Sequence, residues 1–249
     1  CNKYANSRKK IKLDENRVRD LVQVRHDLLF KEFAADPAVT LIRRNVTVGI
    51  PHAFSVHSLW PLYSHFFREL GVNVFLPEQM DRDGLDKMNA PFCFPGEIAH
   101  GMMETVLKRG CTYYFVPHFK DAESLQEDAH ACLCPIVQGF PYYMRTAFQI
   151  PDAKILRPVI DFAHGFDKGG RPFIETAQKL GFSVKEGRHA FRKGVVAYLK
   201  YLKKANDVGR AAMERYEAEG RRAIVIFGRS YNAFTHYANM GIPRKFTSR

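Results

Sequence analysis

The alternation of short β-branched segments with amphipathic segments is the feature that most constrains the fold of this chain. Residues 45–50 (NVTVGI) have the composition of a buried strand, and residues 72–76 form a second short apolar run. Between them, residues 58–70 have apolar side chains at helical spacing, and Gly71 is placed to end that helix in a left-handed conformation. This spacing predicts a right-handed βαβ unit with parallel strands. The ligand side of such a sheet lies beyond the carboxyl ends of its strands.

The alternation continues along the chain. Further strands are predicted at residues 111–116, 134–138, 155–160 and 223–227. Further helices are predicted at residues 96–108, 142–148, 172–180 and 233–239. The pattern therefore predicts an α/β fold with a Rossmann-like, mainly parallel sheet or sheets and with helices on both faces.

Two more helices are predicted beside this alternation. An N-terminal helix spans residues 14–33 and begins at Asp14. The longest helix lies near residues 189–216, where apolar side chains recur every three or four positions in a coiled-coil-like seam. Asn206 and Gly209 interrupt the seam, which predicts a close or bent contact there. The seam faces either the core of this chain or a second copy, and both alternatives stay open.

We expect three parts in the chain. Residues 1–44 form a basic linker and helix, residues 45–150 a Rossmann-like α/β lobe, and residues 151–249 a second α/β lobe that is truncated at its C-terminal end. The first residue is Cys1 and not Met, which is typical of a fragment or a processed product.

The formal net charge of +12 restricts the class of partner. Such a charge indicates solvated basic faces, an anionic ligand such as coenzyme A or a nucleotide, or an acidic protein partner. Nucleic acid is disfavoured, because no helix-turn-helix, RNA-recognition signature or zinc-finger spacing is present. No apolar run is long enough for a membrane span, and the N-terminal residues lack the apolar core and small-residue cleavage site of a secretory signal. The odd number of cysteines, 5, argues against a disulfide framework and favours reduced thiols in the cytoplasm.

Three cysteines lie in predicted loops beside proline, where ligands and reactive groups are commonly placed. Cys93 precedes a predicted helix, and the N-terminus of a helix favours the thiolate form of a cysteine. Cys132 and Cys134 are two residues apart, so in an extended segment both sulfurs face the same side. Thiolates at these positions indicate a metal or cluster site, whereas Cys111 opens an apolar strand and is expected in the core.

Other interpretations of these cysteines remain. A zinc site could combine the three loop thiols with His100, His118 or His130, although no Cys-x-x-Cys pair supports it. A nucleophilic dyad of Cys93 and His100 would need the imidazole to point back over two helical turns, which is not expected. Inert thiols are the remaining alternative.

A separate anion-binding loop is predicted at Gly228, Arg229 and Ser230. These residues follow a predicted strand and precede a helix, where backbone amides can hold an anion, and Arg229 adds positive charge. No Gly-x-Gly-x-x-Gly or Walker pattern accompanies them. His52 and His57 are expected to be loop histidines and not ligands.

Several of these motifs together resemble one known family. The motifs are Val48-Gly-Ile-Pro51, Leu70-Gly71, Cys93-Phe-Pro95 leading to His100-Gly101, Cys134-Pro135, Phe227-Gly-Arg-Ser-Tyr231-Asn232, and Asn239-Met-Gly-Ile-Pro243. Over roughly residues 45–243 the chain resembles the activase-related region of large proteins tied to 2-hydroxyacyl-CoA dehydratases.

The resemblance implies a role near low-potential electron transfer. In the related dehydratases, three cysteines of one subunit hold a [4Fe–4S] cluster between Rossmann-like lobes, and ATP hydrolysis in an activator drives an electron into it. Cys93 and Cys134 match cluster-ligand positions, a third is expected downstream of Pro243, and Cys132 is an additional cysteine that could replace it. The implied partners are the remainder of a larger chain or a dehydratase-like or activase-like protein.

The sequence thus predicts an iron–sulfur-associated module of an ATP-driven electron-transfer protein, without independent activity as an isolated fragment. Any ATPase is expected outside this chain, since no phosphate-loop motif occurs in it. The alternative is a non-catalytic Rossmann-like domain that binds coenzyme A, a nucleotide or a protein partner.

Overall fold

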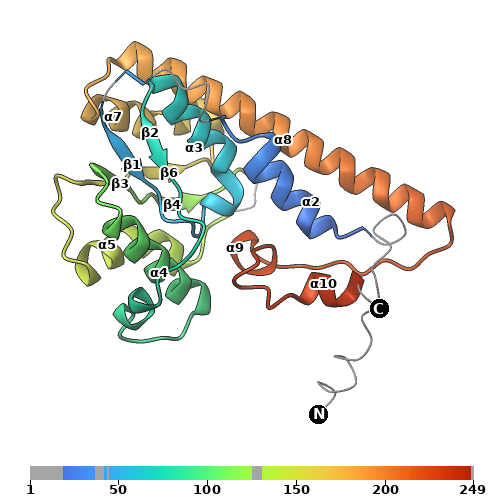
Figure 1. The fold of residues 1–249 in the computed structure, drawn as a ribbon. Helices are drawn as coiled ribbons and strands as arrows, with labels where there is room; N and C mark the ends of the chain where they lie inside the picture. The colour runs from blue at the N-terminus through green and yellow to red at the C-terminus, as the bar shows by residue number, and fades with distance from the viewer. Residues whose placement is uncertain (1–18, 37–41, 44, 125–130, 248–249) are drawn as a thin grey trace.

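The computed structural model describes residues 19–36, 42–43, 45–124 and 131–247 (Figure 1). At its centre is a parallel sheet of four strands in the order β2-β1-β3-β5. A second parallel sheet pairs β4 with β6. The strands span Thr47–Gly49 (β1), Asn73–Phe75 (β2), Tyr113–Phe115 (β3), His118–Asp121 (β4), Ile155–Leu156 (β5) and Val159–Asp161 (β6). The prediction of an α/β fold with a Rossmann-like parallel sheet is confirmed.

The helices follow the strands in the alternating order that the sequence predicts. They are α2 (Leu21–Asp27), the π-helical segment η1 (Leu28–Glu32), α3 (Val56–Leu70), the 3-10 helix η3 (Arg82–Lys87), α4 (Phe94–Lys108), α5 (Pro135–Ala147), α6 (Phe166–Gly169), α7 (Arg171–Lys179), α8 (Val184–Ala218), α9 (Ser230–Ala233) and α10 (Ile242–Thr247). None of these described helices combines the length and the apolar character that crossing a lipid bilayer requires.

The first predicted βαβ unit is present as β1-α3-β2. The two strands are parallel, with Thr47 opposite Asn73. Gly71 follows α3 with φ of 67°, a left-handed conformation that glycine adopts without a steric penalty. The chain can therefore turn sharply out of α3 and enter β2.

Helices cover both faces of the central sheet (Figure 1). On the face of α3, the rings of Tyr63 and Phe67 pack edge-on against Phe115 of β3, with centroids 5.1 and 5.2 Å apart. On the face of α4, a Cβ added to Gly49 in β1 would fall 2.3 Å from Cγ1 of Val106. The absence of a side chain at Gly49 lets α4 lie directly on the sheet.

The long helix α8 packs against α3 through its first half. A Cβ at Gly194 would fall 2.6 Å from the carbonyl oxygen of Leu62, so the two helices meet at this glycine. Phe191 and Tyr201 are buried in the core. The first half of the predicted seam therefore faces the core of this chain and not a second copy. The prediction of a close contact at Gly209 is wrong, because a Cβ there would meet nothing within 4 Å.

The N-terminal helix is shorter in the described residues than predicted. Its N-cap is Asp20, whose carboxylate accepts hydrogen bonds from the backbone N–H groups of Val22 and Gln23. Asp14, the predicted N-cap, lies outside the described residues. Leu28 and Leu29 of η1 are buried against the core, so this segment packs onto the sheet layers as an additional helix.

Two strand predictions need correction around prolines. The predicted strand at 134–138 is wrong, because α5 begins at Pro135 and includes both that segment and the predicted helix at 142–148. Proline is favoured in the first turn of a helix, where its missing N–H costs nothing. The predicted strand at 155–160 is divided into β5 and β6, with Pro158 between them.

The predicted strand at 223–227 is also wrong. This segment is extended but pairs with no described strand, and Ile224 and Phe227 are 65% and 90% exposed. A β-branched composition favours a strand only where a neighbouring strand supplies hydrogen bonds and packing. The helix predicted at 233–239 is displaced, since α9 ends at Ala233. The division of the chain into lobes stays a prediction.

Candidate functional site

Two of the three predicted site cysteines begin helices. Cys93 is the N-cap of α4, and Cys134 is the N-cap of α5, with a proline in the first turn of each helix. Both thiols are partly exposed. The first N–H groups of a helix have no partner within it and form the positive end of the helix dipole, so each thiol lies where negative charge is favoured.

Both cysteines influence one tyrosine of α9 electrostatically. Burial raises the pKa of Tyr231, the nearby Arg229 side chain lowers it by charge and by a hydrogen bond, and the Cys134 and Cys93 thiolates raise it. Charge interactions of this kind fade over roughly 10 Å in physiological salt. Both cysteines are therefore within roughly this range of the same phenol, although 41 positions separate them in the sequence.

Aromatic packing fixes this tyrosine at the carboxyl end of the sheet. Phe54, in the loop after β1, packs edge-on against Tyr231 with centroids 5.2 Å apart. The same phenylalanine packs edge-on against Phe140 of α5 at 4.9 Å. The cysteine site, which we define as Cys93, Cys134, Arg229 and Tyr231, thus lies where ligands of parallel α/β sheets are usually bound.

Cys132, the third predicted ligand, is the most exposed of the three loop cysteines. Its side chain is exposed, and its sulfur accepts a hydrogen bond of 3.2 Å from Nε2 of Gln138 in α5. Within the described part of the chain, no three His, Cys, Asp or Glu side chains are grouped closely enough to hold a metal ion. Whether a cluster is bound stays a prediction.

The predicted anion-binding loop is oriented toward the cysteine site. The strand that should precede Gly228 is not formed, and the helix that follows has only 4 residues. Ser230 shares a hydrogen bond of 2.7 Å with Ser58 of α3, through their hydroxyl oxygens. Arg229 is exposed, and its positive charge lowers the pKa of Tyr231.

The remaining predicted residues have structural roles or lie elsewhere. Cys111 is buried as predicted, and burial raises the pKa of its thiol. His100 is buried with Nδ1 2.8 Å from the carbonyl oxygen of Gly96. His118 lies in β4, whereas His130 falls outside the described residues. The structure therefore gives neither the zinc site nor the dyad a complete set of groups.

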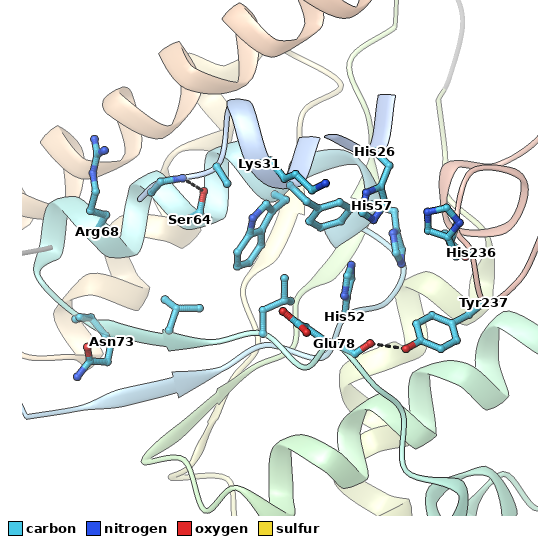
Figure 2. Close-up of a pocket in the computed structure, with 18 residues that line it drawn as sticks. His26, Lys31, His52, His57, Ser64, Arg68, Asn73, Glu78, His236 and Tyr237 are labelled. Carbon is cyan, nitrogen blue, oxygen red and sulfur yellow. Dashed lines mark hydrogen bonds between the residues drawn. The ribbon is translucent and has the colours of Figure 1, made fainter. Parts of the chain in front are cut away.

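A second feature, which the sequence did not predict, is a cavity of about 660 Å³ beside the edge strand β2 (Figure 2). It is lined by residues of α2, η1, α3 and β2, by the residues that follow β1 and β2, and by residues 235–237. His52 follows β1 and Glu78 follows β2, so one end of the cavity lies at the carboxyl edge of the sheet. Figure 2 shows that this end gathers four histidines, His26, His52, His57 and His236.

The rings at this end are in close contact. The Phe30 ring of η1 is 4.6 Å from the His52 ring, and His52 stacks on His57 at 4.8 Å. His26 lies 5.0 Å from His236, which comes from the segment after α9. We call His26, His52, His57 and His236 the histidine cluster.

The pKa values of three histidines of the cluster, His26, His52 and His57, are lowered. Burial lowers the pKa of His52 to about 4. Burial also holds the pKa of His57 well below its usual value, with smaller effects of His52 and Arg25. The pKa of His26 is lowered by burial and then by His236. These rings can therefore contact one another without charge repulsion.

The comparison with protein families identifies the family of this chain. Residues 47–249 match the CoA enzyme activase uncharacterised domain (DUF2229). The chain belongs to this family. Neither the curated proteins nor the solved structures gave a match. The resemblance to an activase-related region is thus confirmed at the level of the family.

The activase domain includes the whole cysteine site but only part of the cavity. Cys93, Cys134, Arg229 and Tyr231 all fall within the matched residues. His26, Phe30 and Lys31 precede them, so the N-terminal helical segment closes a cavity whose other walls belong to the activase domain.

Proposed function

We propose that this activase domain supplies Cys93 and Cys134 as two thiolate ligands of an iron–sulfur cluster in an activase–dehydratase system. The observation that supports this most is that both thiols are partly exposed and cap the N-termini of helices. Family membership supports a role in a CoA enzyme activase system.

The chemistry of the cysteine site suits such a group. Thiolates are the usual ligands of iron–sulfur clusters. Each thiol lies at the positive end of a helix dipole, where negative charge is favoured. Cys93 and Cys134 would thus supply two of the four cysteine ligands of such a cluster. Further ligands would come from Cys132, from a dehydratase-like partner, or from chain outside the described residues.

The surrounding residues would orient the thiols and limit access of water. Phe54 is buried and packs against Tyr231, and the buried Phe140 packs in turn against Phe54. The Tyr231 hydroxyl remains protonated at neutral pH, because burial raises its pKa, and can donate a hydrogen bond to a sulfur atom. A bound cluster would supply one-electron transfer, which none of these side chains provides.

Anaerobic reconstitution with iron and sulfide tests the proposal. Iron and acid-labile sulfide bound per chain, together with the charge-transfer absorption, should show a cluster in the native protein. Cys93→Ser and Cys134→Ser should each remove most of the bound iron, whereas Cys111→Ser, at a buried cysteine outside the site, should retain it. Cys132→Ser shows whether that thiol completes the set.

Equal iron content in all four variants would contradict the assignment. An absence of iron in the native chain would contradict binding by this chain alone. The same reconstitution after mixing with a dehydratase-like partner then tests whether a partner completes the cluster, and no iron there would reject the proposal.

A further inference from the structure

The cavity of Figure 2 contains a buried hydrogen-bond acceptor without a donor. Nδ1 of His52 lies 3.1 Å from the carbonyl oxygen of Pro77. A carbonyl only accepts, so Nδ1 must carry the hydrogen, and the neutral ring presents a lone pair at Nε2. This Nε2 is buried and has no hydrogen-bond partner. An unpaired buried polar atom is destabilising, so the site favours a ligand that donates to it.

Aromatic rings surround this acceptor. Phe30 lies 4.6 Å from His52 and 6.3 Å from Trp60, between centroids. The volume of about 660 Å³ is in the range of small-molecule sites. Flat ligands gain from offset or edge contacts with such rings. The walls therefore suit a planar ring system.

The cationic side chains of the cavity wall are already paired. Nζ of Lys31 is 2.7 Å from the Asp27 carboxylate, and a guanidinium nitrogen of Arg68 is 2.9 Å from the Glu69 carboxylate. Because the neighbouring histidines are neutral, a phosphate inside the cavity would lose its hydration without a free cation to replace it.

A metal ion is the other ligand that neutral imidazoles commonly bind. The described residues offer no group of three metal-binding side chains, in this cavity or elsewhere. A metal is therefore the less favoured occupant, and it is tested below.

We infer that this cavity binds a planar heteroaromatic ring with an amino group, adenine being the type, whose amine donates a hydrogen bond to Nε2 of His52. The ring lies next to Phe30 and Trp60, and any phosphate attached to the nucleoside remains outside. Adenosine, ATP and coenzyme A share this chemistry. The inference is independent of the cysteine site, since none of its four residues lines the cavity.

The single tryptophan of the chain makes the test direct, because Trp60 lies in the cavity wall. Its fluorescence is titrated with adenosine and with purine riboside, which differs only in lacking the amino group. We expect saturable changes with both and about tenfold tighter binding of adenosine, the value of one hydrogen bond to a buried acceptor.

Two variants separate the amine contact from ring packing. In His52→Phe the acceptor is removed, so the tenfold preference for adenosine should disappear. In Phe30→Leu the affinities for adenosine and purine riboside should fall by the same factor, so the preference for adenosine should remain. His164→Gln, at an exposed histidine away from the cavity, is the matched control and should bind as the native chain does.

Three results would overturn the inference. The first is equal affinity of the native chain for adenosine and purine riboside, which needs no variant to fold. The second is an affinity for ATP or coenzyme A more than tenfold higher than the affinity for adenosine, since the protein would then recognise phosphate. The third is a tryptophan fluorescence that changes with none of the ring ligands, or that changes only when zinc is added. Similar affinities for adenosine, ATP and coenzyme A would support it.

Discussion

The imidazole of His52 stacks on the imidazole of His57, with ring centroids 4.8 Å apart and planes inclined by 22°. Two protonated rings could not remain so close in a buried site, because their charges would repel each other with little solvent screening. Arg25, His26 and Lys31 add positive charge around the pair when they are protonated. The stack therefore does not tolerate two protonated rings, and the lowered pKa values keep both rings neutral at neutral pH.

The pH dependence of stability follows from this arrangement. The unfolded chain protonates its histidines near pH 6.5, whereas folded His52 does so near pH 4. Between these values the unfolded state binds more protons, so the free energy of unfolding falls as the pH decreases from 6.5 to 4. His52 alone would account for about 3 kcal/mol, from 1.36 kcal/mol per pKa unit.

Urea denaturation at several pH values measures this dependence. The native protein and the His52→Phe variant are compared, so that carboxylates common to both cancel. The difference between their unfolding free energies should change by the expected amount between pH 7 and pH 4. A constant difference would show that His52 is not kept neutral by the fold.

The contact between α3 and α8 predicts opposite effects at two glycines of the same helix. Gly194→Ala places a methyl group 2.6 Å from the carbonyl oxygen of Leu62, so the helices must separate, at a cost of about 1–3 kcal/mol. Gly209→Ala meets nothing within 4 Å and should stabilise α8 by up to about 1 kcal/mol. Urea midpoints of the two variants test this, and a loss of stability in both would contradict the packing.

The thiols should react with iodoacetamide in the order of their exposure. Cys132 is exposed and should be alkylated first, Cys93 and Cys134 more slowly, and Cys111 only after unfolding. Burial also raises the pKa of the Cys111 thiol, which reduces its reactive thiolate. Peptide mass spectrometry over time gives each rate. Native-state labelling of Cys111 as fast as of Cys132 would reject the described burial.

The sequence alone predicts the correct element where the local residue pattern and the tertiary packing favour the same conformation. The β1-α3-β2 unit was predictable, because Gly71 marks the end of an amphipathic helix between two β-branched runs. Cys93 was predictable at a helix start for the same reason, since Pro95 suits a first turn. At Cys134 the same signal, Pro135, is present, but the apolar pattern of residues 134–138 predicts a strand where the structure has the start of α5.

The histidine cavity could not be predicted from local pattern. His26 and His236 are 210 positions apart, and only the packing of η1 and of the segment after α9 against β2 brings them together. The lone pair of His52 depends on the carbonyl of Pro77, a tertiary contact. One signal was available, however, since His52 and His57 follow the first strand, at the ligand side of the sheet.

The segment 223–227 gives a last prediction, because its composition and its environment disagree. Phe227 is 90% exposed and packs against little, so Phe227→Ala should change the free energy of unfolding by less than about 0.5 kcal/mol. Phe115 is fully buried in β3, and Phe115→Ala should cost about 3–5 kcal/mol. Urea denaturation of this matched pair measures both. A loss of more than about 2 kcal/mol at Phe227 would mean that the segment is packed in solution, as a strand paired with a second copy of the chain would be, and the dependence of the loss on protein concentration would then identify that pairing.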